Sequence, residues 1–312
     1  LPAPMVHGNA TIPKQNAAQV TNKGVEFSVN WSDRVGKDFD YNVGFNFTYI
    51  KNNVDKFKGD EPSYDGARML KEGLPIWSLY VREIDRIIQT DADLALVETM
   101  LNNPEVEGKV VFPYGVPQKG DILYKDLNGD GLVNDDDRTV IGNGKNPTFT
   151  YGVNLGFNWK GIDFSMNWAG AAGFKINWYQ SGENSSITWF GYGMGKDVAY
   201  DHYFYDPENP NDPRTNLTSA NPRLTMDKAA QVSVSGQHIL HNGNYLKLKN
   251  LTVGYTLPKD WVQKVCMQNV RVYVSGENLL TITKFKGIDP EMMSGVGYAP
   301  MRQYAFGVNV TF

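Results

Sequence analysis

The sequence predicts an all-β protein: an antiparallel transmembrane β-barrel, of which this chain supplies the C-terminal strands. Three observations predict this fold. Seven stretches alternate apolar and polar residues, the apolar positions of these stretches begin or end in aromatic residues, and the connections between them are short on one side and long on the other. We expect the complete barrel to have more strands than these seven, and 22 is the number that we predict.

Strict alternation identifies the seven strands, because successive side chains of a strand point to opposite faces. In residues 41–49, Tyr, Val, Phe, Phe and Tyr alternate with Asn, Gly, Asn and Thr. Lys160 and Gly161 join two such stretches as a hairpin turn. The predicted strands are 25–31, 41–49, 149–159, 162–169, 250–257, 270–277 and 304–312.

A soluble antiparallel sandwich with one wet face would produce the same alternation. Two features favour the membrane. Tyr, Trp and Phe stand at the ends of the apolar faces, as in lipid-facing strands that cross the headgroup level. The opposite faces carry Asn, Gly, Thr and Ser rather than the Lys and Glu of a soluble surface.

The connections assign the two sides of the membrane, because outer-membrane barrels have short periplasmic turns and long extracellular loops. Residues 33–38, 160–161 and 258–268 form short or moderate connections. Counting back from Phe312 places every short connection inside and every long one outside. The expected extracellular regions are 51–147, 171–244 and 284–300, with residues 1–20 in a further outer loop.

Composition excludes several classes of protein. The net charge of −4 and the absence of a Lys/Arg cluster argue against nucleic-acid binding. One cysteine, Cys266, cannot form an internal disulfide framework. Of the four histidines, His238 and His241 lie three apart without an acidic partner at metal-ligand spacing, and no Gly-x-Ser-x-Gly motif occurs, so we expect no enzyme.

Several motifs, taken in order, resemble the SusC/RagA family of TonB-dependent outer-membrane transporters. The resemblance covers almost the whole chain and rests most on Gly120-Asp-Ile-Leu-Tyr-Lys-Asp-Leu-Asn-Gly-Asp-Gly. Further similar segments are 16–26, 136–138, 141–142, 207–210, 221–224, 245–258 and 271–279. The family's plug and its TonB-interacting segment have no counterpart in these residues.

The resemblance implies nutrient import across the outer membrane of a Bacteroidota-type Gram-negative bacterium. The implied partners are a SusD-like surface lipoprotein, an N-terminal plug and barrel portion of the same transporter, and TonB acting through that portion. The implied cargo is an oligosaccharide or a peptide. Two alternatives stay open: a secreted soluble calcium-containing β-sandwich lectin and a passive outer-membrane porin.

An acidic loop at 126–137 has the ligand spacing of a calcium site. Asp126, Asn128 and Asp130 offer side-chain oxygens at positions 1, 3 and 5, Leu132 offers a backbone carbonyl at position 7, and Asp137 a carboxylate at position 12. Position 12 is Asp rather than the usual Glu. The alternative is an acidic turn held by Asx hydrogen bonds without metal.

Aromatic residues crowd the long connection at 171–244. Trp189, Tyr203 and Tyr205 are the expected contacts to substrate or to a lid, because aromatic faces beside amides and carboxylates suit sugar rings and peptide side chains. The alternative is that these rings form the small core that a large loop needs.

Overall fold

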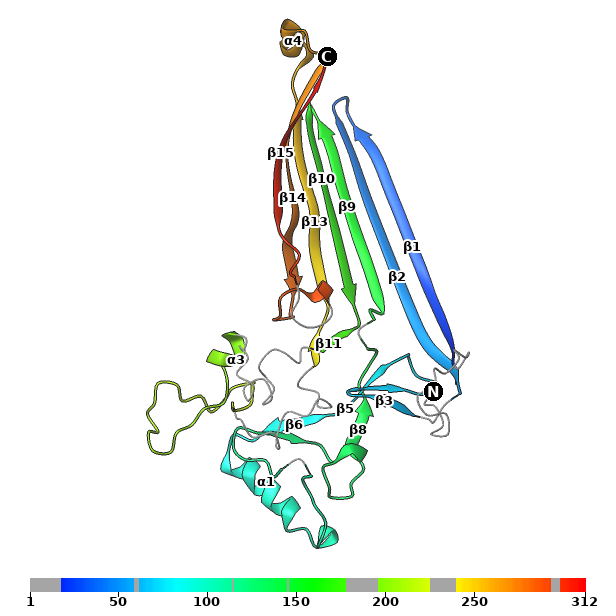
Figure 1. Cartoon of the computed structure of the whole chain (residues 1–312). Coiled ribbons are helices and arrows are strands. Elements are labelled where there is room, and N and C mark those ends of the chain that lie inside the picture. Colours follow the sequence, from blue (N-terminus) through cyan, green and yellow to red (C-terminus); the bar gives the residue numbers. More distant parts are fainter. Residues whose placement is uncertain are drawn as a thin grey trace, which may run out of the picture.

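One antiparallel sheet of seven long strands dominates the computed structural model of the chain (Figure 1). The structure describes residues 18–58, 62–113, 115–144, 146–177, 196–224, 240–292 and 298–312. The strands follow one another in sequence order, each antiparallel to the next. They are β1 (Ala18–Val35), β2 (Phe39–Phe57), β9 (Phe149–Trp159), β10 (Ile162–Ala172), β13 (Tyr245–Thr256), β14 (Asn269–Thr283) and β15 (Gln303–Thr311).

All seven predicted strands are confirmed, and so is the hairpin turn between β9 and β10. Lys160 and Gly161 have φ angles of 48° and 86°, as a two-residue turn with two positive φ values requires. A Cβ atom at Gly161 would lie 2.7 Å from the carbonyl oxygen of Thr256, so glycine is needed there for space as well as conformation.

The first hairpin is longer than the alternation predicted. Pairing between β1 and β2 continues from the turn to Ala18 and Phe57, although the apolar alternation stops near Ile50. Beyond that point most residues of both strands are polar. Asn52 donates a side-chain hydrogen bond to Asn22 across the pair at 2.7 Å. At about 3.3 Å per residue the hairpin is roughly 60 Å long. A strand of ~10 residues, about 33 Å, is enough to cross a bilayer, so the hairpin extends far beyond it.

The two ends of the sheet differ as the connection lengths predicted (Figure 1). At one end lie the turns at 36–38 and 160–161, and the connection at 257–268 that holds α4 (Lys259–Val262) and η5 (Gln263–Val265). The long connections at the other end contain further elements, among them η6 (Pro290–Met292) between β14 and β15.

Those long connections carry a second folded region, which we call the outer unit: the described residues of 62–148 and 196–224. It has a four-stranded sheet in the order β3-β4-β5-β8 and a β6-β7 pair; a β11-β12 pair lies between it and the main sheet. The elements of the outer unit are β3 (Ser63–Asp65), β4 (Arg68–Leu70), β5 (Ser78–Arg82), β6 (Ile84–Ile87), α1 (Asp91–Leu101), η2 (Pro104–Val106), β7 (Ile122–Tyr124), η3 (Asp135–Asp137), β8 (Arg138–Val140) and α3 (Lys196–Tyr200). The pair between the two regions is β11 (Lys175–Asn177) and β12 (Leu240–Asn242) (Figure 1).

Helix α1 begins at a capping box. The Thr90 hydroxyl accepts a hydrogen bond from the Asp93 backbone N–H, and the Asp93 carboxylate accepts one from the Thr90 backbone N–H. The Asp93 carboxylate also accepts from the Thr90 hydroxyl, and hydrogen bonds from this hydroxyl, from the backbone N–H groups of Thr90 and Gln89 and from Arg86 hold the pKa of Asp93 far below its ordinary value. The helix is thereby fixed beside the β6-β7 pair.

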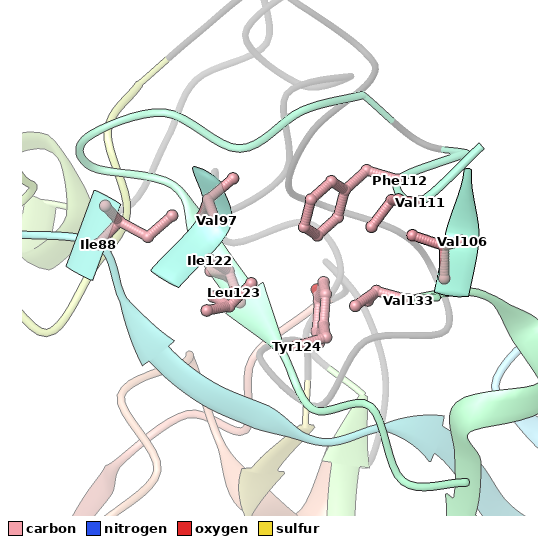
Figure 2. Close-up of a cluster of buried hydrophobic side chains, with 9 residues drawn as sticks. All are labelled: Ile88, Val97, Val106, Val111, Phe112, Ile122, Leu123, Tyr124 and Val133. Carbon is pink, nitrogen blue, oxygen red and sulfur yellow. The ribbon is translucent and has the colours of Figure 1, made fainter. Parts of the chain in front are cut away.

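The largest buried cluster of the described residues belongs to the outer unit rather than to the main sheet. It lies between α1, β7 and the segments around them (Figure 2). Its buried members are Ile88, Val97, Val106, Val111, Phe112, Ile122, Leu123, Tyr124 and Val133. The outer unit therefore has a small hydrophobic core of its own.

Of the helices in the described ranges, none has the length and apolar character to cross a membrane.

Candidate functional site: the faces of the sheet and the outer unit

One face of the main sheet is apolar and uncovered. Phe27 is 54% exposed, Trp31 60% and Phe306 81%. Strand register aligns these residues with apolar partners on neighbouring strands, for example Trp31 with Val43. A continuous exposed apolar face of this extent calls for an apolar surrounding, because water contact costs about 25 cal/mol per Å².

Aromatic rings gather at both ends of this face. Near the short turns, Phe157 lies between Phe39 and Phe164, with ring centroids 5.7 Å and 5.0 Å away. Near the long connections, the Phe149 ring centroid lies 5.2 Å from that of Tyr49. These are the positions of the two aromatic girdles of a membrane barrel.

The spacing of the two girdles matches a bilayer. Strand β9 begins at Phe149 and ends at Trp159, which at ~3.3 Å per residue is about 33 Å along the strand. A strand tilted by about 40° then spans roughly 25 Å of height, the height of the apolar band of an outer-membrane barrel.

The opposite face is polar across all seven strands. The register places one such residue from each strand in a single lateral row. Apart from one glycine, the row carries amides and one carboxylate, which suit contact with water or with a polar solute. Its members are Asn30, Gly44, Asn154, Asn167, Asn250, Glu277 and Gln303.

Asparagine amides on this face lie over glycines of the neighbouring strand. A Cβ atom at Gly44 would meet the Asn30 Oδ1 atom at 2.6 Å, and one at Gly152 would meet the Asn46 Nδ2 atom at 2.8 Å. The Asn side chains can therefore lie along the wall instead of standing away from it. This explains why glycine alternates with apolar residues in β2 and β9.

A paired charge crosses the polar face near its short-turn end. The Arg271 Nε atom donates to the Asp163 Oδ1 atom at 2.8 Å, between β14 and β10. The pair passes over Gly254 of β13, where a Cβ atom would lie 2.4 Å from Asp163 Oδ1 and 2.5 Å from an Arg271 nitrogen. The positive charge of Arg271 and the negative charge of Asp163 therefore balance each other on the polar face.

The two long segments of the outer unit are joined by a buried ion pair, here called the clasp. Asp121 is fully buried, and the Arg223 guanidinium donates to both of its carboxylate oxygens, one contact being 3.2 Å. The Arg223 backbone N–H also donates to the Gly120 carbonyl at 2.8 Å. Gly120 and Arg223 each belong to a motif noted in the sequence, but neither motif indicates that the two segments meet.

The predicted substrate contacts fall in different surroundings. Tyr203 is buried against Gly120 of the clasp, where a Cβ atom would lie 2.5 Å from its ring, and burial raises the pKa of Tyr203. Tyr205 is 44% exposed. Trp189 lies outside the described residues. Contact of these residues with substrate or a lid stays a prediction.

The predicted calcium loop is a compact turn whose carboxylates accept backbone hydrogen bonds. Asp126 accepts from the N–H groups of Gly129 at 2.7 Å and Gly131 at 2.8 Å. Asp137 is fully buried and accepts from those of Leu127 and Asn134, both at 2.9 Å. Asx hydrogen bonds of this kind were the alternative to a metal.

The remaining predicted ligands lie within the same turn. Asp130 accepts from the Leu132 N–H at 2.8 Å, and the Asn128 side chain donates to Asp130 at 3.2 Å. Within the described ranges, no three His, Cys, Asp or Glu side chains gather as a metal site. A calcium ion here would use the Asn128 amide and the Leu132 carbonyl as well, and calcium stays a prediction.

Sequence relatives of the chain are TonB-dependent receptors. It is 29% identical over 323 residues to TonB-dependent receptor P3 of Formosa agariphila, covering 96% of this chain and 29% of that protein. It is 25% identical to TonB-dependent receptor SusC of Bacteroides thetaiotaomicron, covering 92% of this chain and 25% of that protein. The chain thus spans less than a third of the length of these curated relatives. No family model matches it.

Solved structures show the same fold. The RagAB peptide transporter matches the whole chain with a TM-score of 0.70 at 24% identity, and the chain covers 31% of that protein. The RagAB peptide importer in its closed-closed state matches with a TM-score of 0.66 at 23% identity, over 100% of this chain and 32% of that one. At this identity the likeness establishes the fold and leaves the cargo open.

Proposed function

The chain belongs to the SusC/RagA family of TonB-dependent outer-membrane transporters, and we propose from this that it forms part of the barrel wall and outer mouth of a nutrient importer. The observation that carries the proposal is the two-faced sheet. Its apolar face, bounded by two aromatic girdles, fits lipid, and its amide-rich face fits a polar passage.

The chain would contribute wall, mouth and partner surface rather than the driving force. In this proposal a plug and further strands come from an N-terminal portion of the same transporter, and TonB acts through that portion. A SusD-like surface lipoprotein would meet the outer unit. The clasp supports this role, because a partner binds best to a surface whose segments are held in place beforehand.

The proposed cargo is an oligosaccharide or a peptide. Side-chain amides such as those of Asn30, Asn154 and Asn167 both donate and accept hydrogen bonds, so they can bind sugar hydroxyls or peptide groups. The long connections, with exposed aromatic residues such as Tyr205, would supply stacking contacts.

The soluble lectin alternative requires the apolar face to be covered. In the part of the chain that the structure describes, Trp31 and Phe306 stay largely exposed. The seven strands also form one sheet rather than two packed sheets. The open apolar face therefore favours a membrane wall.

Cell fractionation followed by mass spectrometry of the intact detergent-extracted particle tests the proposal. We expect this chain in the outer membrane, together with plug-bearing polypeptide and a surface lipoprotein. Growth on defined oligosaccharides and on peptides, with and without the gene, would then identify the cargo. Recovery of the chain alone in the soluble fraction would refute the proposal.

A further inference from the structure

A cluster of four charges, centred on the buried Lys247, lies at the outer end of β13, where the long connections begin. Lys247 is 1% exposed, and its Nζ atom contacts Asp289 at 2.6 Å and Glu291 at 2.9 Å. The Lys249 Nζ atom contacts Glu291 at 2.7 Å. Both acids belong to the connection between β14 and β15, so the cluster joins that connection to a different strand (Figure 1).

Strand register shows on which face the cluster lies. Lys247 pairs with Ala169 of β10, whose polar-face row continues to Gly152 and Asn46. The register shifts between Leu248 and Asn250, so Lys249 is an extra residue in the strand. A bulge of this kind re-aims side chains, and here both lysines reach the same segment. The acids are therefore held on the polar face.

A second, apolar attachment fixes the start of the same segment. Phe285 is buried with Ala171, Phe174 and Ile176, and Tyr245 packs against this group. The Phe285 backbone N–H donates to the Thr283 hydroxyl at 3.0 Å. Residues 284–292 are thus attached at both ends, by an apolar contact first and by the charge cluster second.

We infer that Lys247 and Lys249 are positioning residues that hold residues 284–292 against the polar face as a fixed rim of the mouth. The inference rests on the proposed function, because it takes the polar face to line the passage. With the rim in place, this side of the mouth has a set width. The lysines act through Asp289 and Glu291 and need not touch the cargo.

The balance of charge explains why one lysine has a large effect. Two lysines and two carboxylates neutralise each other in a place with little solvent. Removal of Lys247 leaves Asp289 and Glu291 together with a single, more exposed lysine, and an uncompensated buried charge is strongly unfavourable. The segment relieves this by moving its carboxylates out into water.

The test uses the full-length transporter in outer membrane with its natural partners. Lys247→Met and Glu291→Gln are the variants, and Arg34→Met is the matched control, because it breaks an exposed ion pair with Asp40 at the short-turn end. Hydrogen–deuterium exchange of residues 284–292 and uptake kinetics of the native cargo are measured at equal surface levels.

We expect at least tenfold faster exchange of residues 284–292 in Lys247→Met, with β1 and β2 unchanged, and a KM for uptake altered at least threefold. Glu291→Gln keeps the side-chain shape and should give a smaller change in the same direction, so it serves if Lys247→Met does not assemble. Exchange equal to that of Arg34→Met in both variants would refute the attachment.

Faster exchange with unchanged KM and maximal rate would refute the positioning role. Failure of the unmodified protein to take up any cargo would instead count against the proposed function, because the exchange measurement does not depend on transport. The two failures are therefore distinguishable.

Discussion

Asp137 shows how a single carboxylate organises the acidic loop. It is fully buried and accepts hydrogen bonds from backbone N–H groups of Leu127 and Asn134 on both sides of the turn. A shared carboxylate of this kind closes the loop whether or not a cation is present. The compact turn fits the alternative without metal as well as a bound cation, and the metal itself stays a prediction.

Calcium removal tests that prediction. If the loop binds calcium, chelation frees negative charge at Asp126, Asp130 and Asp137 and should speed amide exchange in residues 126–137 at least tenfold. Metal analysis of the purified protein should also find about one calcium ion per chain. An Asp126→Asn variant is the control, since its exchange should no longer respond to the chelator. Unchanged exchange and no stoichiometric calcium would rule the site out.

Acid should loosen the rim formed by residues 284–292. Burial alone would raise the pKa of Glu291, but hydrogen bonds from Lys249 and Lys247 outweigh it and hold the pKa below its ordinary value. A lowered pKa means that the carboxylate stabilises the fold above about pH 4.3 and that this contribution is lost as the pH falls through the lowered value.

Amide protection of residues 284–292, corrected for intrinsic exchange, should therefore fall between about pH 5 and pH 3. In Glu291→Gln this step should be absent, because the glutamine does not titrate. An equal pH step in both proteins would show that a different group controls the segment.

At the residue scale, the sequence is informative where one segment holds the whole arrangement. The compact turn at 126–137 is local, so its spacing is visible in the sequence. The clasp is not local: Asp121 and Arg223 are 102 residues apart. No pattern in either segment indicates which distant residue it meets, and Tyr203, predicted to contact substrate or a lid, lies buried at that junction.

At the scale of elements, alternation identifies the two faces of each strand, and paired substitutions can test the assignment. Leu155 and Asn154 are neighbours in β9 and lie at the same depth, on the apolar and the polar face. Leu155→Arg should destabilise the barrel by about 2–4 kcal/mol, because its charge would face lipid near the bilayer centre. Asn154→Arg should cost much less.

Urea titration of the purified full-length barrel in lipid vesicles measures both free energies of unfolding. The neighbouring position serves as the internal control, because each variant adds the same side chain to the same strand. Equal destabilisation by the two arginines would contradict the assignment of faces.

Alternation predicted the strands inside the bilayer and missed their extension beyond it. Within the apolar band, lipid on one face and a polar interior on the other impose a period of two. Past Ile50 the β1-β2 hairpin leaves the apolar band, so the residues Lys51, Asn52 and Asn53 carry no alternation although the strands still pair. The ends of these strands depend on backbone hydrogen bonds, which leave no apolar pattern.

At the scale of the whole molecule, the outer unit depends on the clasp between its two segments. Arg223→Met would remove the guanidinium that donates to both oxygens of the buried Asp121 carboxylate, and removing one partner of a buried ion pair typically costs about 3–5 kcal/mol. We expect increased protease cleavage of both segments with the main sheet intact. Arg214→Met is the control, because Arg214 is exposed and pairs with the nearby Asp212.

Cleavage no faster in Arg223→Met than in Arg214→Met would contradict the view that the two segments form one unit. The sequence predicted long outer connections at these positions but not their folded interior. Its buried residues come from short elements such as β7 and from irregular segments around Val111 and Val133, where no periodic pattern marks the core.

In the proposed barrel, one face of the main sheet meets lipid and the other lines a polar passage. Spin labels placed singly at residues 150–158 of β9, in full-length protein with Cys266→Ser, test it most directly. Labels at odd positions should collide mainly with oxygen dissolved in lipid, and labels at even positions mainly with a water-soluble relaxation reagent or with other protein. Accessibility without this period of two, or without lipid contact at odd positions, would contradict it.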